Sequence, residues 1–177
     1  MKHRDELGIL FTERGYKVAA EIGVQSGVFA DIILANWDGT LHMVDCWQHI
    51  EQGYKDIANV SDGLHQIHKG RAEAVAAKHN GRGKIIVGLS PEASSLFQDG
   101  SLDAVYLDGN HCYEAVMADL AAWSKKIKVG GLICGHDYAD GSFPQGEFGV
   151  KSAVAEYFGK EPDFITTVDW PSWGVYL

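Results

Sequence analysis

The chain has 177 residues, of which 46% are hydrophobic and 22% charged, and this balance is typical of a globular domain. Its 24 acidic and 15 basic residues give a formal net charge of −9, which argues against a nucleic acid or an anionic membrane as the main partner. No stretch approaches the roughly 18 apolar residues of a membrane helix, and the charged N-terminus does not resemble a secretory signal. We therefore expect one cytoplasmic domain over residues 1–177.

Strand-like and helix-like segments alternate along the chain, which predicts an α/β fold with a mostly parallel sheet between helices. Residues 1–16 are expected to contain an N-terminal helix. Strands are predicted at 17–22, 41–45, 84–87, 104–107 and 132–134. Helices are predicted at 26–36, 64–78, 112–127 and 150–158, with a short one after Ser90. The C-terminal residues read as two short strands joined by a tight turn.

Several details of this pattern carry specific expectations. Leu64 and Ile67 should face the core at helical spacing. Gly130-Gly131 should end the helix over 112–127, and residues 135–147 should form a loop. Asp119 is expected on a solvated helix face. The long irregular segment 46–63 is a candidate lid over a substrate.

Ligands of open parallel sheets bind beyond the carboxyl ends of the strands, so the residues at those ends are the candidate site. Acids, imidazoles and glycines concentrate there. In strand order they are Glu21, Gly23 and Gly27; Asp45, Cys46 and Trp47; Gly88 and Ser90; Asp108, Asn110 and His111; and His136 and Asp137.

The first two strand ends favour a nucleoside ligand. The stretch EIGVQSG lets the backbone approach a ligand closely, although its glycines could also simply form a tight turn. Asp45 lies where a carboxylate can accept both hydroxyls of a ribose, or where it could cap a loop. Trp47 could cover an adenine ring or belong to the core.

These residues, together with VDCW, YLDGNHCYEAVMADLAAW and VGGLICGHDY, resemble class I S-adenosylmethionine-dependent methyltransferases. The likeness is to the branch of small O-methyltransferases that contains the catechol and caffeoyl-CoA enzymes, and it covers most of the chain. It implies a Rossmann-like three-layer sandwich with strand order 3-2-1-4-5-7-6 and an antiparallel last strand.

The resemblance also implies a cofactor site. The loop 21–27, with Glu21, Gly23, Ser26 and Gly27, would lie along the methionine part of S-adenosylmethionine. Asp45, followed by Cys46 and Trp47, would hold the ribose. Gly88, Leu89 and Ser90 would lie near the adenine, and Asp108 would face the cofactor or a metal.

Some members of the branch bind a divalent ion, and the matching positions here are Asp108, His136 and Asp137. The histidine departs from the family pattern, so Mg²⁺ and Mn²⁺ are both candidates. His111 matches the position of the family's catalytic base, and its ordinary pKa of about 6.5 suits proton removal near neutrality. His111 could instead cap the following helix.

The leading functional hypothesis is methyl transfer to a hydroxyl of a small molecule. The alternatives are a metal-independent N-methyltransferase and a catalytically silent cofactor-binding module. A nicotinamide oxidoreductase is disfavoured, because the third glycine of the G-x-G-x-x-G fingerprint is missing. Because the chain is short, a homodimer is also considered as its assembly state.

Overall fold

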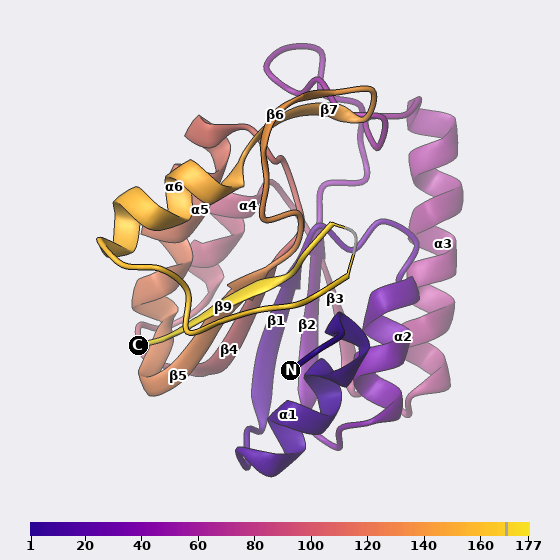
Figure 1. The fold of residues 1–177 in the computed structure, drawn as a ribbon. Coiled ribbons are helices and arrows are strands. Elements are labelled where there is room, and N and C mark those ends of the chain that lie inside the picture. Colours follow the sequence, from indigo (N-terminus) through magenta and orange to yellow (C-terminus); the bar gives the residue numbers. More distant parts are fainter. Residues whose placement is uncertain (169) are drawn as a thin grey trace.

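A seven-stranded sheet forms the centre of the computed structural model, which describes residues 1–168 and 170–177 (Figure 1). The strand order is β3-β2-β1-β4-β5-β9-β8. The five strands from β3 to β5 are parallel, and β9 runs antiparallel to both β5 and β8. This confirms the predicted order and the antiparallel last strand. The strands are β1 (Val18–Ile22), β2 (Thr40–Asp45), β3 (Gly83–Val87), β4 (Leu102–Leu107), β5 (Ile127–Gly135), β8 (Phe164–Ile165) and β9 (Trp173–Tyr176).

Side chains of successive strand residues point to opposite faces of the sheet. Since the apolar side chains on both faces are buried, helices cover both faces. In β1, Ala19 belongs to one buried cluster and Ala20 to the other. The first cluster includes side chains of α1 (Leu7–Glu13), α2 (Val28–Ala35) and α3 (Asp62–Lys78), and the 3-10 helix η1 (Arg4–Glu6) precedes α1. The second includes side chains of α4 (Ser90–Ala93), α5 (Tyr113–Trp123) and α6 (Val150–Phe158); the 3-10 helices η2 (Ser94–Leu96) and η3 (Ser124–Lys126) follow α4 and α5. Figure 1 shows these two helical layers on either side of the strands.

The predicted role of Gly130-Gly131 as a helix end is wrong. The helix α5 ends at Trp123, and β5 begins at Ile127 immediately after η3, so both glycines lie inside the strand. The pairing of β4 with β5 shifts register between Leu102 and Ala104, and Gly130 there adopts a φ of +81°. The glycines therefore form a bulge that lets β5 resume pairing with β4.

The inward face of α3 also differs from the prediction. Leu64 and Ile67 are 38% and 54% exposed, whereas His65, Ala72 and Ala76 are buried. A Cβ at Gly27, before α2, would lie 3.1 Å from the Cα of Ala72. The helices approach so closely that small residues occupy the contact and the larger apolar side chains turn outward.

The predicted loop at 135–147 contains a hairpin formed by β6 (Asp140–Phe143) and β7 (Gly146–Gly149). In Figure 1 it lies above the carboxyl ends of the strands, beside the segment between β2 and α3. That segment, residues 46–61, is irregular, and we call it the lid segment. The Ile57 amide donates to the Gln145 carbonyl at 2.9 Å, and Asp56 forms an isolated bridge with Gly146. Two stretches far apart in sequence thus pair over the site.

Across the described residues, no helix is both long and apolar enough to span a bilayer.

Candidate active site

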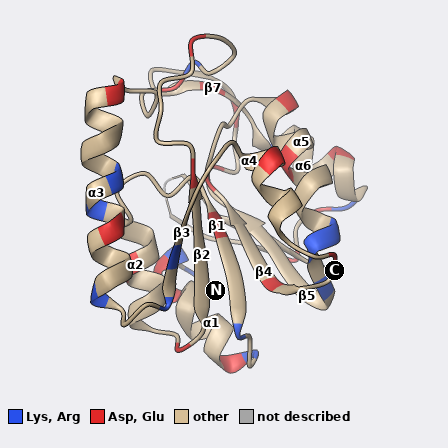
Figure 2. Cartoon of the chain, turned by 180° about the vertical axis from the view of Figure 1, so that it is seen from behind, with Lys and Arg blue, Asp and Glu red and all other residues tan. Residues whose placement is uncertain are grey.

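A cavity of about 530 Å³ opens at the carboxyl ends of β1, β2 and β4. Its size lies within the range of ordinary small-molecule sites. Figure 2 shows acidic positions at the ends of these central strands. The predicted residues that line the cavity are Glu21, Gly23, Ser26, Asp45, Cys46, Gly88, Leu89, Ser90, Asp108 and His111. Gly27 and Trp47 do not line it, and His136 and Asp137 lie behind Asp108 and His111.

The loop after β1 is pressed against the end of β4. Gly23 has a φ of +87°, and a Cβ there would lie 2.0 Å from the backbone oxygen of Asp108. Glycine alone meets both the conformation and the close approach.

The carboxyl group of Glu21, at the end of β1, is buried without a partner. Glu21 is 1% exposed, and its Oε2 has no hydrogen-bond partner. Burial, reinforced by the charge of Asp108, raises the pKa of Glu21 well above its ordinary value. An unpaired buried carboxyl that borders a cavity is suited to bind a ligand donor.

Asp45 shapes the turn after β2. Its Oδ2 accepts from the Gln25 amide and its Oδ1 from the Trp47 amide, both at 2.8 Å. Each carboxylate oxygen has a second lone pair, so the side chain can also accept from a ligand. Trp47 itself is 1% exposed, and its indole donates to the Gln25 carbonyl at 2.7 Å. Of the two roles considered for Trp47, its position matches core packing: it buttresses the loop rather than facing the cavity.

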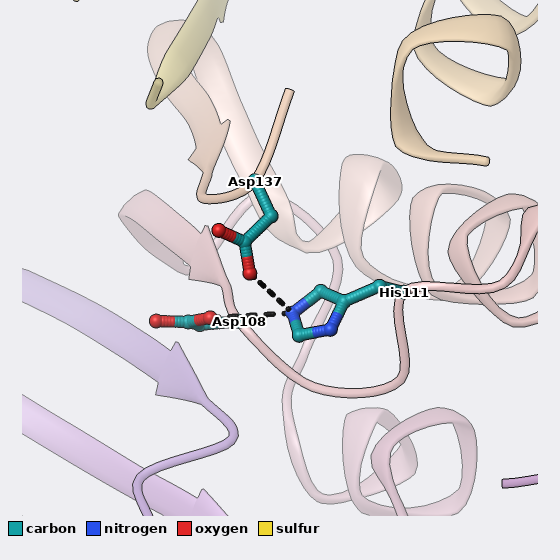
Figure 3. Close-up of side chains that lie close together, drawn as sticks. All are labelled: Asp108, His111 and Asp137. Carbon is teal, nitrogen blue, oxygen red and sulfur yellow. Dashed lines mark hydrogen bonds and ion pairs between the residues drawn. The ribbon is translucent and has the colours of Figure 1, made fainter. Parts of the chain in front are cut away.

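Three side chains from the ends of β4 and β5 converge at one side of the cavity (Figure 3). The Nε2 of His111 lies 3.4 Å from Asp108 Oδ1 and 3.1 Å from Asp137 Oδ2. One ligand atom from each residue fits within 4.8 Å of the others, which makes the trio a candidate metal site. His136 lies farther out, with Nδ1 2.8 Å from Asp137 Oδ1 and 3.7 Å from Asp108 Oδ1. It is placed to pair with the carboxylates.

The charges of this cluster are strongly coupled. Burial would lower the pKa of His111, but its ring donates to Asp108 and Asp56, and these contacts raise the pKa to about 10. Burial would raise the pKa of Asp108, yet His111, His136 and Arg4 hold it below its ordinary value. The surrounding carboxylates therefore favour the imidazolium form of His111, and its pKa lies above the value near neutrality expected from its type alone.

The lid segment supplies the fourth group of the cluster. Asp56 Oδ2 lies 3.0 Å from Nδ1 of His111, on the opposite edge of the ring from Asp108 and Asp137. The ring also stacks on Phe148 of β7, with 5.0 Å between centroids and 4° between planes. Next to it, Asn110 donates to the Gly53 carbonyl at 3.1 Å. His111 thus binds carboxylates instead of capping the helix that follows it.

Asp119, expected on a solvated face, is instead 6% exposed at the edge of the cavity. Ser90 Oγ donates to its Oδ1 at 2.5 Å and accepts from the Trp123 indole at 3.0 Å. Burial raises the pKa of Asp119 to about 7. The helix pattern failed here because α5 packs on two neighbours, so its polar position at 119 points at α4 rather than at water.

Sequence reasoning missed the lining residues Arg4 and Asp119, together with the His111 partner Asp56. Tyr54 and Asp56 lie in the segment identified as a candidate lid, so its length and aromatic content were a usable signal. Arg4 lies before any predicted strand, and no local pattern connects it to the site.

Comparison with known proteins identifies the family and supports the fold. A family model described as a methyltransferase domain matches residues 20–138. No curated protein matches the chain by sequence. Among solved structures, an O-methyltransferase from Bacillus cereus in complex with S-adenosylhomocysteine is similar with a TM-score of 0.66 at 15% identity, covering 98% of this chain and 80% of the other. An O-methyltransferase from Streptomyces achromogenes, involved in tomaymycin synthesis and bound to S-adenosylmethionine, gives 0.67 at 14% identity, covering 98% and 78%.

The family match spans well over half of the chain, including the loop after β1, the end of β2 and the Asp108–Asp137 region. The seven-stranded order, with one antiparallel strand inserted beside β5, is the class I arrangement. The chain therefore belongs to the methyltransferase family, as a class I S-adenosylmethionine-dependent methyltransferase.

Proposed function

We propose that the protein transfers a methyl group from S-adenosylmethionine to a hydroxyl of a small molecule. The observation that carries this proposal is the convergence of Asp108, His111 and Asp137 beside a cavity whose floor is the loop after β1. A proton acceptor and two carboxylates at that place suit the activation of an acceptor hydroxyl.

The residues around the cavity fit the cofactor. The unpaired Oε2 of Glu21 can accept from the methionine ammonium group, and Gly23 leaves room for the chain beside it. The spare lone pairs of Asp45 can accept from the ribose hydroxyls. Gly88, Leu89 and Ser90 border the remaining side, where the adenine would lie. We assign Gly27 and Trp47 to shaping the loop and Cys46 and Ser26 to the cavity wall.

The two carboxylates of this cluster fit a divalent ion. Asp108 and Asp137 would hold it through their oxygens, a donor set compatible with Mg²⁺ or, with the imidazole of His136 beside it, Mn²⁺, while Nε2 of His111 is kept for proton transfer. A bound ion would lower the pKa of an acceptor hydroxyl. His136 pairs with Asp137 and would orient that carboxylate.

His111 is the residue we assign to proton removal. Asp56 fixes one edge of the ring, which leaves Nε2 directed at the carboxylates and the acceptor side. The ring must be neutral to accept a proton, and the surrounding carboxylates favour its charged form. A positive charge that balances Asp108 and Asp137 would remove this preference for the charged form. His111 can therefore act as a base only when another group balances the charge of these two carboxylates. The chain contributes mainly by aligning the two reactants.

A metal-independent methyl transfer is the second candidate. One observation favours it: the His111 imidazolium already lies between Asp108 and Asp137, where an ion would otherwise balance their charge. An amine acceptor would then need no ion to lower a hydroxyl pKa.

Calorimetric titration with S-adenosylhomocysteine, with and without Mg²⁺ or Mn²⁺ and with NAD as the control ligand, tests the cofactor assignment. We expect binding of S-adenosylhomocysteine and none of NAD. Asp45→Ala should weaken this binding by at least about 1 kcal/mol, roughly fivefold, through lost ribose hydrogen bonds. The exposed Asp38, on the turn before β2, provides the matched control Asp38→Ala, which should leave the affinity unchanged. Equal affinities of all three proteins would refute the ribose role.

Turnover assays separate the two candidate reactions. On an acceptor found by screening hydroxylated small molecules and amines, His111→Ala should abolish turnover while the affinity for S-adenosylhomocysteine stays within about twofold. Loss of activity in a chelator, restored by Mg²⁺ or Mn²⁺, supports the metal-assisted hydroxyl reaction. Full activity in the chelator on an amine acceptor would establish the second candidate instead.

A further inference from the structure

Arg4 is the only lysine or arginine among the residues that line the cavity. The carboxyl groups around it are numerous: Glu21, Asp45, Glu92, Asp108 and Asp119 also border the cavity. A ligand carboxylate that enters this acidic cavity needs a cationic side chain as its partner. The nitrogens of His111 are already occupied by Asp56, Asp108 and Asp137, so this requirement points to Arg4.

The fold holds Arg4 in place from both sides. Leu7 and Phe11 of α1 are 0% and 1% exposed and anchor η1 against α2. The guanidinium lies over the ring of Phe29, 4.9 Å from its centroid, and Nη1 is 3.5 Å from Asp108 Oδ2. The side chain is 32% exposed. The guanidinium is thus oriented by a ring and a carboxylate but is not closed off from the cavity.

The position of Arg4 relative to Glu21 matters for the ligand. Arg4 and Glu21 line the same cavity, and the positive charge of Arg4 opposes the rise that burial causes in the pKa of Glu21. A buried carboxyl and an arginine that line one cavity match the ammonium and the carboxylate of a free amino acid. A guanidinium has five donors in a planar fork, so Arg4 can keep its contact with Asp108 and still receive a carboxylate.

We propose that Arg4 binds the α-carboxylate of the methionine part of the cofactor, while Glu21 receives the ammonium group. This inference rests on the proposed function, since it requires an S-adenosyl amino acid in the cavity. It makes the N-terminal segment part of the cofactor site, although that segment precedes the first strand. It also predicts that the protein discriminates an S-adenosyl amino acid from a nucleoside thioether without a carboxylate.

The test crosses variants of Arg4 with truncated ligands in calorimetry. The ligands are S-adenosylhomocysteine, its decarboxylated analogue, which keeps the amine, and 5′-methylthioadenosine, which lacks both groups. The proteins are the wild type, Arg4→Met, Arg4→Lys and, as the matched control, Arg14→Met. Arg14 also lies over an aromatic ring, that of Tyr176, but is not among the cavity-lining residues. Thermal unfolding of each variant checks that it is folded.

We expect the wild type to bind S-adenosylhomocysteine about 10- to 100-fold more tightly than the decarboxylated analogue, as a charge-assisted hydrogen-bonded pair implies. Arg4→Met should bind the two ligands equally, at the affinity of the wild type for the analogue. Arg4→Lys should recover part of the difference, and Arg14→Met should behave as the wild type.

Two results would overturn the inference while leaving the cofactor assignment intact. In one, Arg4→Met retains full affinity for S-adenosylhomocysteine, which would mean that backbone amides of the loop after β1 hold the carboxylate. In the other, Arg4→Met weakens all three ligands equally, which would mean that Arg4 only supports the fold of the site. Failure of the wild type to bind S-adenosylhomocysteine and 5′-methylthioadenosine alike would instead contradict the proposed function, and the inference with it.

Discussion

Replacing the buried Asp119 by asparagine should stabilise the protein at alkaline pH and not at acidic pH. Burial raises the pKa of Asp119 to about 7 in the folded chain, whereas an unfolded chain has the ordinary value of about 3.9. The folded state therefore keeps the Asp119 carboxyl protonated to a higher pH than the unfolded state does. The stabilising contribution of Asp119 is present below pH 4 and is lost as the pH rises from about 4 to 7. Asparagine cannot ionise, and its carbonyl can still accept from Ser90.

The magnitude follows from linkage between protonation and folding. Moving a pKa from 3.8 to about 7 corresponds to about 4 kcal/mol over the whole range, of which about 2 to 3 kcal/mol falls between pH 5 and pH 8. The difference in unfolding free energy between Asp119→Asn and the wild type should therefore be larger at pH 8 than at pH 5 by that amount.

Urea unfolding at the two pH values, without ligand, measures this difference. The exposed Glu114 on the same helix provides the control Glu114→Gln, whose effect should be the same at both pH values. Equal effects of Asp119→Asn at pH 5 and pH 8 would show that the carboxyl is not ionising in a buried site. A greater loss of stability at pH 8 would mean that the charged form of Asp119 is the one the fold stabilises.

Two further substitutions test other parts of the structure. Gly23→Ala should destabilise the fold by at least about 2 kcal/mol and prevent S-adenosylhomocysteine binding, because a Cβ there would lie 2.0 Å from a backbone oxygen at the end of β4. Gly159→Ala, with a φ of +62° and no heavy atom within 4 Å of the Cβ, should cost less in urea unfolding and leave binding intact; equal costs would refute the clash. Asp31→Asn should lower stability at pH 7 by less than about 1 kcal/mol, since Asp31 is 34% exposed. Lys78 and His79 lower the pKa of Asp31, so this contribution exists above about pH 4 and disappears as the pH falls further; an unchanged acid transition would contradict it.

The alternation of strands and helices was predictable because it follows from local signals repeated along the chain. Apolar runs alternate with helical periodicity, and right-handed crossovers then leave few arrangements. The strand-end positions were predictable for the same reason: once β1, β2 and β4 are parallel neighbours, Glu21, Asp45 and Asp108 must share one edge. The family resemblance supplied the order of the strands and the antiparallel last strand, which the periodicity did not contain.

Burial of single side chains was less predictable, because it depends on the neighbour rather than on the local pattern. Trp47 follows a strand end like a cavity residue, yet its indole turns inward to the Gln25 carbonyl. Asp119 has helical spacing that would place it at the surface of an isolated helix, but α4 covers it. The glycines of β5 read as a helix end because a bulge inside a strand and a turn use the same residues.

The charge balance of the site shows why Arg4 and the partners of His111 could not be read from the chain. Each carboxylate at the strand ends lies next to the strand that positions it, so sequence adjacency reveals it. His111 also follows a strand end, but its ring is held by Asp56 of the lid segment and Phe148 of β7, and Arg4 comes from the segment before β1. Their positions depend on segments that meet only in the folded chain. An acidic strand edge therefore predicts that cations must reach it, while only the folded structure shows which residues they are.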